Sequence, residues 1–507
     1  MAQASVASTS ISAEADYRRY TLLLVCGLIV ITGLFGRALN PIFVNDQAEM
    51  LVLSQSFEWV YDEQPPLYAW IARLFLLGTN NSVFVLDVIK YGFLSVAVFA
   101  IYFTGRAITE RFGVGLLSIA LAFSLPTMGE DALAEATHSV ALIACSAFSA
   151  LVLLNNLQRP SRWLWLLLAV VWTLGLAFKH TMVVIALSQM MAVWFCGTQF
   201  RGALLKHMIG AGLIMALINA PFFYVLANTQ AALNNGLHEF HMDAMAWGAL
   251  RGLLDLISSV LTEAAVLTVI ALVLWVTRSK SKIGRDGPLD IKSRFLLISV
   301  VVFIGLFAVM VIATGTSVVR DRWLAPALIW LAPLIAVQLT RRLGSRRLRA
   351  LVTVSLAFVV INAGFRAVES NWLATRGEIN ANTINYPAMV QNVLEIETAP
   401  DFIIAEDASL AANFYLMAQT PTAYPNSYVP PLEFTPRQIM MVWYGDREVP
   451  PEMTAILNRL RNGMDVDVCQ SHAVDGPLRT HQTIQVRYSV ALCQVSGPEH
   501  QTPIQRG

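Results

Sequence analysis

Long apolar runs with almost no charged residues recur along the chain up to about residue 366. Examples are TLLLVCGLIVITGLF from residue 21, WLWLLLAVVWTLGLAF from residue 163 and AAVLTVIALVLWV from residue 264. Each approaches or reaches the roughly 17–25 residues that cross about 30 Å of hydrocarbon. Only 14% of the residues are charged, whereas soluble domains have about a quarter. We therefore predict an α-helical polytopic membrane protein.

The distribution of Lys and Arg predicts how the chain crosses the bilayer. Cytoplasmic loops are enriched in both residues. An N-terminus in the cytoplasm puts most of them inside, including the clusters RSKSKIGRDGPLDIKSR and RRLGSRRLR. We expect about 11–13 transmembrane helices, a cytoplasmic tail over 1–19 and a membrane domain over 20–365. The expected apolar segments begin near residues 21, 83, 113, 140, 163, 181, 207, 252, 295, 323 and 350.

The run from Trp163 to Phe195 is interrupted only by Lys179 and His180. One straight helix over this run would measure about 50 Å at 1.5 Å per residue, too long for a single crossing. Both ends carry Arg and are expected inside. The sequence therefore predicts a hairpin of two short spans, or a re-entrant pair, whose tip GLAFKHT reaches the outer face.

The pattern of residues changes after about Asn371. Short β-rich runs (DFIIAED, IMMVWYG, TIQVRYSVALCQV) alternate with helical patterns such as SLAANFYLMAQ. This alternation is typical of an α/β domain, which we place over 366–507 on the outer, periplasmic side. Cys469 and Cys493 both fall there, in a compartment that permits disulfides; whether they pair is left open.

Acids, imidazoles and bases gather on the loops predicted to face outward. The first outer loop, 37–82, contains FVNDQAEM and YDEQPPLYAW, and later loops contain TMGEDALAEATHS, Lys179-His180, NNGLHEFHMDAMAW and TGTSVVRDRWLAP. A phosphate leaving group needs Arg or Lys, and an acceptor hydroxyl needs a carboxylate within hydrogen-bond reach. The pattern favours a reaction on a lipid-linked phosphate at the outer leaflet. No feature indicates a nucleic-acid partner.

Three ionisable residues fall within apolar spans, where such groups usually mark a site. They are Lys90, Asp255 and Glu263. Asp255 and Glu263 share one helical face, and the simplest expectation is pairing with a Lys or Arg elsewhere in the bundle. His238 and His241 are spaced as an i,i+3 metal pair, although a surface amphipathic segment is the simpler interpretation.

Four short segments resemble the GT-C class of glycosyltransferases, in particular the dolichyl-phosphate-mannose–protein mannosyltransferase-like branch. This branch includes lipid A aminoarabinose transferases and galacturonosyltransferases of lipopolysaccharide. The resemblance covers residues 20 to about 360. It is carried by NDQAE from residue 45, QPPLYAW from residue 64, GLAFKH from residue 175 and RWLAP from residue 322.

The resemblance implies a role for each residue that matches the family's pattern. Asp46 would be the catalytic acid residue, acting as base on the acceptor or orienting it. Either Glu135 or His138 would fill the second acid position. The usual Asp-Glu pair is Asp46-Gln47 here, which puts a two-carboxylate or metal-bound mechanism in question. No metal ligand or cofactor is assigned, and a divalent metal is left open. The implied substrate-binding residues are Gln64, Tyr68, Lys179, His180 and Arg322, with Lys90 as an extra base for a uronic acid donor.

The resulting hypothesis is an inverting sugar transfer at the outer face of a bacterial inner membrane. The donor would be a polyprenyl-phosphate-linked sugar. The acceptor would be lipopolysaccharide or lipid A, another glycan, a lipid or a protein. The alternatives are a transporter or flippase for a lipid-linked or anionic solute and a non-catalytic subunit. Transporters tend to place ionisable groups near the midplane between two repeated halves, and the sequence shows no repeat.

Overall fold

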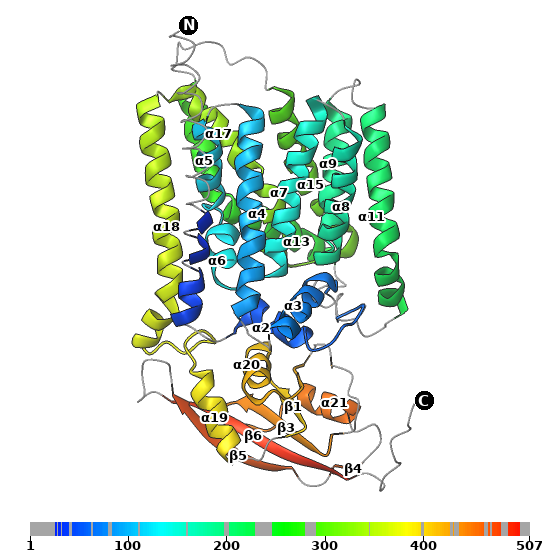
Figure 1. The fold of residues 1–507 in the computed structure, drawn as a ribbon, viewed down its shortest axis with the longest axis vertical. Coiled ribbons are helices and arrows are strands. Elements are labelled where there is room, and N and C mark those ends of the chain that lie inside the picture. Colours follow the sequence, from blue (N-terminus) through cyan, green and yellow to red (C-terminus); the bar gives the residue numbers. More distant parts are fainter. Residues whose placement is uncertain are drawn as a thin grey trace.

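The structure, a computed structural model, consists of a helical body with a sheet-containing domain at one end (Figure 1). The described residues are 26–27, 29–31, 33–39, 43–61, 64–79, 84–109, 112–158, 161–196, 202–228, 246–278, 290–343, 345–396, 400–425, 429, 436–460, 465–466, 469–477 and 485–496.

The helical body contains the apolar helix Ile29–Leu39 and a series of further helices. They are α2 Asn45–Leu53, α3 Leu67–Gly78, α4 Phe84–Ile108, α5 Phe112–Ala122, η1 Thr127–Asp131, α6 Ala132–Ala134, α7 His138–Gln158, α8 Arg162–Phe178, α9 Met182–Cys196, α11 Ala203–Asn228, α13 Ala246–Glu263, α14 Ala265–Arg278, α15 Ile291–Thr314, η2 Asp321–Trp323, α16 Ala325–Leu328, α17 Leu331–Arg342 and α18 Ser345–Thr375.

Five of the described helices are long and apolar enough to cross a membrane: α4, α7, α11, α15 and α18. Two further candidates are bent, α5 against η1 and α6 by 89° and α13 against α14 by 72°. A helix begins close to each predicted segment start from residue 83 to residue 350. The predicted hairpin is present, because α8 and α9 are separate helices joined at Lys179–Thr181. The total number of crossings stays a prediction.

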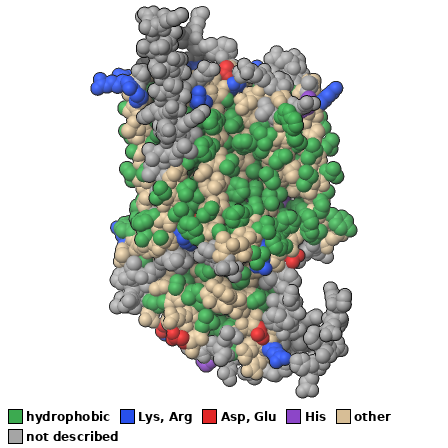
Figure 2. All heavy atoms as spheres, viewed as in Figure 1, with side chains coloured by type: hydrophobic (Ala, Val, Ile, Leu, Met, Phe, Trp, Pro, Cys, Tyr) green, Lys and Arg blue, Asp and Glu red, His purple; other side chains and the backbone are tan. Residues whose placement is uncertain are grey.

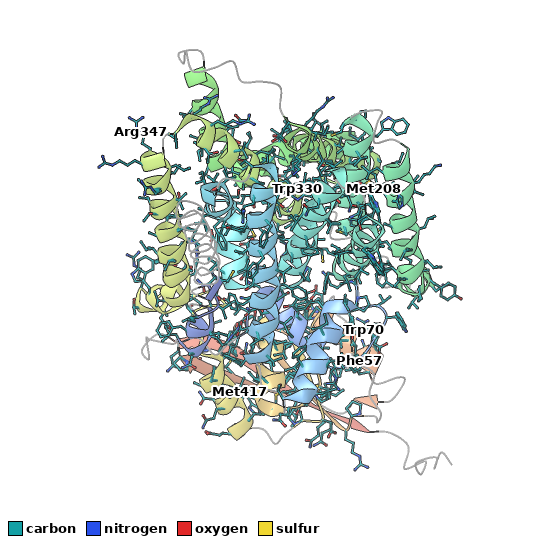
Figure 3. The ribbon with its side chains drawn as sticks, turned by 45° about the horizontal axis from the view of Figure 1, so that its top comes forward. Phe57, Trp70, Met208, Trp330, Arg347 and Met417 are labelled. Atoms are coloured by element: carbon teal, nitrogen blue, oxygen red, sulfur yellow. A yellow bond between two sulfur atoms is a disulfide. The ribbon has the colours of Figure 1, made fainter. Side chains whose placement is uncertain are left out.

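The outer surface of the helical body is apolar. Leu213, Leu217, Val354 and Ile361 are each more than half exposed, and hydrophobic side chains cover this face of the body (Figure 2). Apolar exposure on this scale marks contact with lipid or a partner. Basic side chains gather at the end away from the sheet (Figure 2), where Arg347 lies (Figure 3). The protein is a multi-pass membrane protein.

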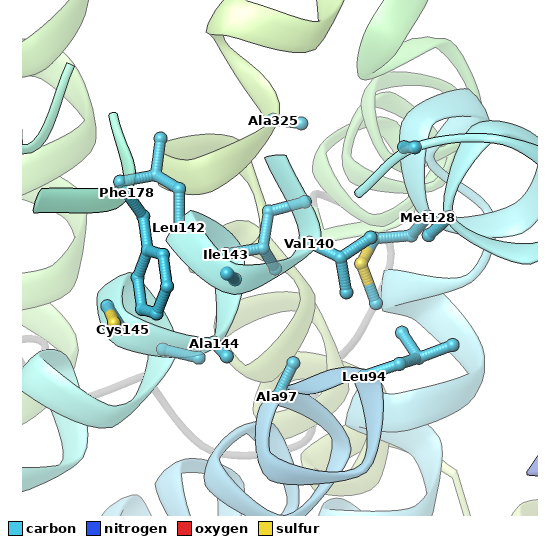
Figure 4. Packing of buried hydrophobic residues seen from close by; sticks show 14 of the residues in the cluster. Leu94, Ala97, Met128, Val140, Leu142, Ile143, Ala144, Cys145, Phe178 and Ala325 are labelled. Carbon is cyan, nitrogen blue, oxygen red and sulfur yellow. The ribbon is translucent and has the colours of Figure 1, made fainter. Parts of the chain in front are cut away.

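The interior of the body is closely packed around α4 and α7. Ala97 of α4 and Ala144 of α7 are both fully buried (Figure 4), and small side chains let helices approach closely. The same buried core continues through α2 into the inner face of the sheet, where it includes Ile403 and Met440. The two parts of the protein therefore share one hydrophobic core.

The C-terminal domain, from α19 to β6, is the α/β unit that the sequence predicts. Strands β1 and β2 pair in parallel, β1 and β3 also pair in parallel, and β6 pairs antiparallel with β3, β4 and β5. Helix α20 covers the face toward the body, and α21 packs on the other face. The elements are α19 Tyr386–Ile396, β1 Phe402–Ala405, α20 Ala408–Ala418, β2 Thr422–Ala423, β3 Gln438–Tyr444, α21 Pro451–Leu460, β4 Asp465–Val466, β5 Gln470–Pro477 and β6 Gln485–Ser496.

Two details refine the sequence analysis of this domain. Cys469 and Cys493 form a disulfide that ties the start of the β5 segment to β6, which settles the pairing that the sequence leaves open. Helix α18 continues to Thr375, past the predicted boundary at residue 366. Its last turns carry the polar stretch AVESN, so the hydropathy change precedes the end of the helix.

Candidate active site

The first turn of α2 presents Asp46 to the interior of the protein. Helix α2 lies between the body and the C-terminal domain (Figure 1), and Asp46 is 7% exposed. Its Oδ1 accepts a hydrogen bond from Arg322 Nη1 at 2.8 Å. Arg322 lies on η2, in the connection between α15 and α16. The structure thus joins two predicted site residues that are far apart in the sequence.

His138 and Lys179 complete the group around Asp46. His138 begins α7, and its Nε2 lies 3.3 Å from Lys179 Nζ. Lys179 also donates to Ser139 Oγ at 3.0 Å from its position at the C-terminal end of α8. The Thr137 hydroxyl donates to the Asp46 carbonyl at 3.5 Å. The hairpin tip therefore reaches the start of α7, beside Asp46.

The charges around Asp46 set its protonation. Burial by itself raises the pKa of this carboxyl, but the positive charges of Arg322 and Lys179 and the hydrogen bond from Arg322 outweigh burial and hold the pKa below its ordinary value. The carboxylate is therefore ionised at neutral pH. Its Oδ2 is buried and has no hydrogen-bond partner among the described residues. A buried carboxylate oxygen normally has a partner, so this oxygen is available to a bound substrate.

Glu135 and Lys90 lie on the other side of α2. Asn45 donates to the Glu135 carboxylate, and Lys90 Nζ donates to the Ala134 carbonyl at 2.8 Å. Burial raises the pKa of Glu135, while the Asn45 bond acts against this. Both residues line a cavity of about 390 Å³. Its other charged residues are Arg37, Asp87, Glu130, Asp131, Arg366 and Glu369.

Gln64, Tyr68 and His180 have different surroundings. Gln64 pairs with Tyr61 through their backbones. Asp62 and Glu63, which lie between these two residues in the sequence, are outside the described part. Tyr68 is 1% exposed, and its hydroxyl is buried without a partner among the described residues. The His180 ring stacks on Phe222 of α11, with centroids 5.4 Å apart. Of the three, Tyr68 has the orphaned polar atom expected of a binding residue.

A polar network next to Asp46 escapes the sequence analysis. Gln47 accepts a hydrogen bond from Arg37 and donates to the Ala134 carbonyl at 3.2 Å. Arg37 also forms an ion pair with Asp87 of α4. Gln47, which occupies the position of Glu in the usual Asp-Glu pair, therefore forms a neutral bridge between α2 and α6. An Asp in an apolar span, one turn before Lys90, is the sequence signal that could have found Asp87.

The polar face of α13 holds backbone groups, which corrects the expectation of a Lys or Arg partner. Asp255 accepts from the Val319 N–H at 2.5 Å, and Ser259 donates to the Val319 carbonyl at 2.8 Å. One turn further on, Glu263 accepts from the Thr127 N–H at 3.2 Å. Bent helices and irregular loops leave backbone groups that must be satisfied inside the bilayer, and these side chains satisfy them.

Metal ligation finds no support in the described residues, where no three His, Cys, Asp or Glu side chains lie close enough together to hold an ion. His238 and His241 fall outside the described part.

Comparisons with known proteins found similar sequences and a similar fold. The family model described as dolichyl-phosphate-mannose-protein mannosyltransferase matches residues 63–225. The fold resembles the crystal structure of ArnT from Cupriavidus metallidurans in the apo state, with a TM-score of 0.60 at 12% identity, covering 94% of this chain and 98% of that one. Fold and site together define a multi-pass membrane protein with the GT-C fold.

Two curated proteins of Rhizobium johnstonii are similar over most of the sequence. The lipopolysaccharide core galacturonosyltransferase RgtA is 26% identical over 419 residues, which is 79% of this chain and 82% of that protein. RgtB, of the same description, is 21% identical over 424 residues, covering 80% and 84%. The chain is a glycosyltransferase with the GT-C fold, and its residues 63–225 are similar to the dolichyl-phosphate-mannose-protein mannosyltransferase family.

Proposed function

We propose that the protein transfers a sugar from a polyprenyl-phosphate donor to a glycan or glycolipid of the cell envelope, at the outer face of the bacterial inner membrane. One observation carries the proposal: Arg322 holds Oδ1 of Asp46, while Oδ2 is buried without a partner among the described residues. An ionised carboxylate with one fixed and one available oxygen suits a general base. The names of RgtA and RgtB make galacturonic acid and the lipopolysaccharide core the first substrates to test.

The residues around Asp46 support an inverting displacement. The acceptor hydroxyl donates to Asp46 Oδ2 and attacks the anomeric carbon from the face opposite the phosphate. The new bond from carbon to acceptor oxygen forms as the bond to the phosphate oxygen breaks. The proton passes to Asp46, and the phosphate leaves with the bonding electrons. Lys179 and Arg322 supply the positive charge that stabilises this leaving group.

The donor sugar is better placed beside Arg322 and Lys179 than beside Lys90. Five acids and three bases line the cavity around Lys90. A uronate carboxylate there would face net negative charge, and like charges repel strongly where water is scarce. In this proposal Lys90 balances Asp87 of α4 and Glu135, which follows α6, and the anionic parts of the donor bind beside Asp46.

The test compares cells that lack the gene with cells that carry the wild-type protein or Asp46→Asn. Mass spectrometry of the envelope glycolipids shows which mass increment depends on the gene. We expect Asp46→Asn to reach wild-type protein levels and to lose that increment. The matched control, Asp446→Asn, changes an exposed acid of the C-terminal domain and should keep the increment. An increment that survives Asp46→Asn would refute the enzyme and favour the transporter or non-catalytic alternative.

A further inference from the structure

Both ends of α2, the helix that carries Asp46, are hydrogen-bonded to the C-terminal domain. At the leading end, the Phe43 N–H donates to Asn413 Oδ1 at 3.3 Å, and Asn413 Nδ2 donates to the Phe43 carbonyl at 2.8 Å. At the trailing end, Gln55 Nε2 donates to the Thr422 carbonyl at 2.9 Å, and the Thr422 N–H donates to Gln55 Oε1 at 2.8 Å. Each contact is a two-point amide pair that fixes orientation as well as distance.

These contacts come from two adjacent elements of the C-terminal domain. Asn413 lies on α20, which packs along α2. Thr422 lies on β2, the edge strand beside β1. The Gln55 amide occupies backbone groups on the open side of this edge. Asn413, Phe43 and Thr422 are almost completely buried, and Gln55 is partly buried, so water is excluded from the Asn413 pair more completely than from the Gln55 pair. A typical net contribution is about 0.5–1.5 kcal/mol per bond.

Helix α2 depends on such outside contacts for its position. It has only nine residues, and helices this short are marginal by themselves. Its N-cap residue, Val44, makes no side-chain capping bond. Asn45 has φ of 48°, in the left-handed region that Asn adopts more readily than most residues other than glycine. The start of the helix beside Asp46 therefore departs from regular helical geometry.

We propose that Asn413 and Gln55 are positioning residues, through which the C-terminal domain sets the place of the Asp46 carboxylate. This inference rests on the proposed role of Asp46 as base. The C-terminal domain then has a part in catalysis, because the donor side and the base are held by different halves of the protein. Lys179 and Arg322 belong to the helical body, whereas α2 is aligned from the sheet side.

The test measures the purified full-length protein against membrane vesicles from the deletion strain, which supply native donor and unmodified acceptor. Asn413→Leu and Gln55→Met remove the amide pairs at similar side-chain size. We expect the saturating rate to fall about tenfold for each variant and about 100-fold for both together. The vesicle concentration at half-maximal rate should change less than twofold. The matched control, Asn392→Leu, changes an amide of α19 that bonds to Asp475 and should behave as wild type.

A pH profile separates positioning from simple stability. If Asp46 moves away from Arg322, its carboxyl binds a proton more readily, and the acid limb of the rate profile shifts to higher pH. A folded variant with an unchanged rate and an unchanged acid limb overturns the inference. If Asn413→Leu does not fold, Gln55→Met alone decides by the same criteria. Asp46→Asn is measured in parallel. Full activity of Asp46→Asn overturns the proposed function and this inference together. If Asp46→Asn is inactive while the variants at Asn413 and Gln55 behave as wild type, only this inference is overturned.

Discussion

Replacing Arg322 by Gln should damage catalysis more than folding. The change removes the guanidinium that lies 2.8 Å from Asp46 Oδ1, where the two side chains are 28% and 9% exposed. Removing one preorganised donor that stabilises developing charge lowers the rate about 100- to 1,000-fold. Because the Arg322 side chain is partly solvated, we expect the lower part of this range, a rate about 30- to 150-fold lower at neutral pH, or about 2–3 kcal/mol of transition-state stabilisation.

The same substitution should move the pH dependence in a defined direction. The pKa of Asp46 now lies below its ordinary value, despite burial, because of neighbouring positive charge. Without Arg322, a positive charge and a hydrogen bond that lower the pKa of Asp46 are lost, and its pKa rises. The acid limb of the rate profile should therefore shift to higher pH. The ion pair stabilises the native state above the unfolded-state pKa of about 3.9, and this stabilisation is lost as the pH falls through the folded-state pKa.

The assay is the initial rate of sugar transfer from pH 4 to pH 9, with thermal unfolding in detergent as the measure of folding. Arg320→Gln is the matched control, because it removes a positive charge from the same loop and leaves the bond to Asp46. Arg322→Lys keeps the charge but not the planar geometry, and should recover the acid limb more completely than the rate. A folded Arg322→Gln protein with wild-type rate and acid limb would show that this ion pair does not operate in the working enzyme.

Three other substitutions test separate parts of the structure. Lys179→Met should lower the saturating rate in the vesicle assay at least tenfold. Its thermal unfolding temperature in detergent should change little. Asp255→Leu should leave the Val319 N–H unsatisfied. It should lower the thermal unfolding temperature and, through the loop that carries Arg322, the transfer rate. Asp255→Asn keeps an acceptor oxygen and should lower the unfolding temperature and the rate less. Cys469→Ser removes a disulfide between residues 24 positions apart and should lower the free energy of unfolding by about 3 kcal/mol. Wild-type protein in reducing agent should show the same loss of stability.

The arrangement of the helices follows from the sequence to a large extent, because hydrocarbon leaves few alternatives. Apolar runs must form helices in a bilayer, so their starts could be located, and Lys179 with His180 had to interrupt a run too long for one crossing. Grouping polar residues by the side they face also brought Asp46, His138, Lys179 and Arg322 into one set. The structure places these four side by side.

The details that the sequence does not predict are those in which a side chain satisfies a backbone group far away. The sequence predicts cationic partners for Asp255 and Glu263, but these side chains accept hydrogen bonds from N–H groups freed where the backbone bends or leaves a helix. No pattern in the sequence specifies which N–H groups those bends leave without a partner. In the same way, Gln47 was interpreted only as a missing acid, because its bond with Arg37 depends on how the first helix lies against α2.

In the proposed mechanism, the charge state of Asp46 ties activity to complete assembly. Burial alone would favour the protonated, inactive carboxyl, so the base exists only where positive groups oppose burial. These groups are Lys179 at the end of α8 and Arg322 on η2, and the helix that presents Asp46 to them is hydrogen-bonded to α20 and β2. A partly assembled chain would therefore contain Asp46 without an active base. Sugar transfer by the C-terminally truncated protein, with the acid limb of the wild type, would contradict this argument.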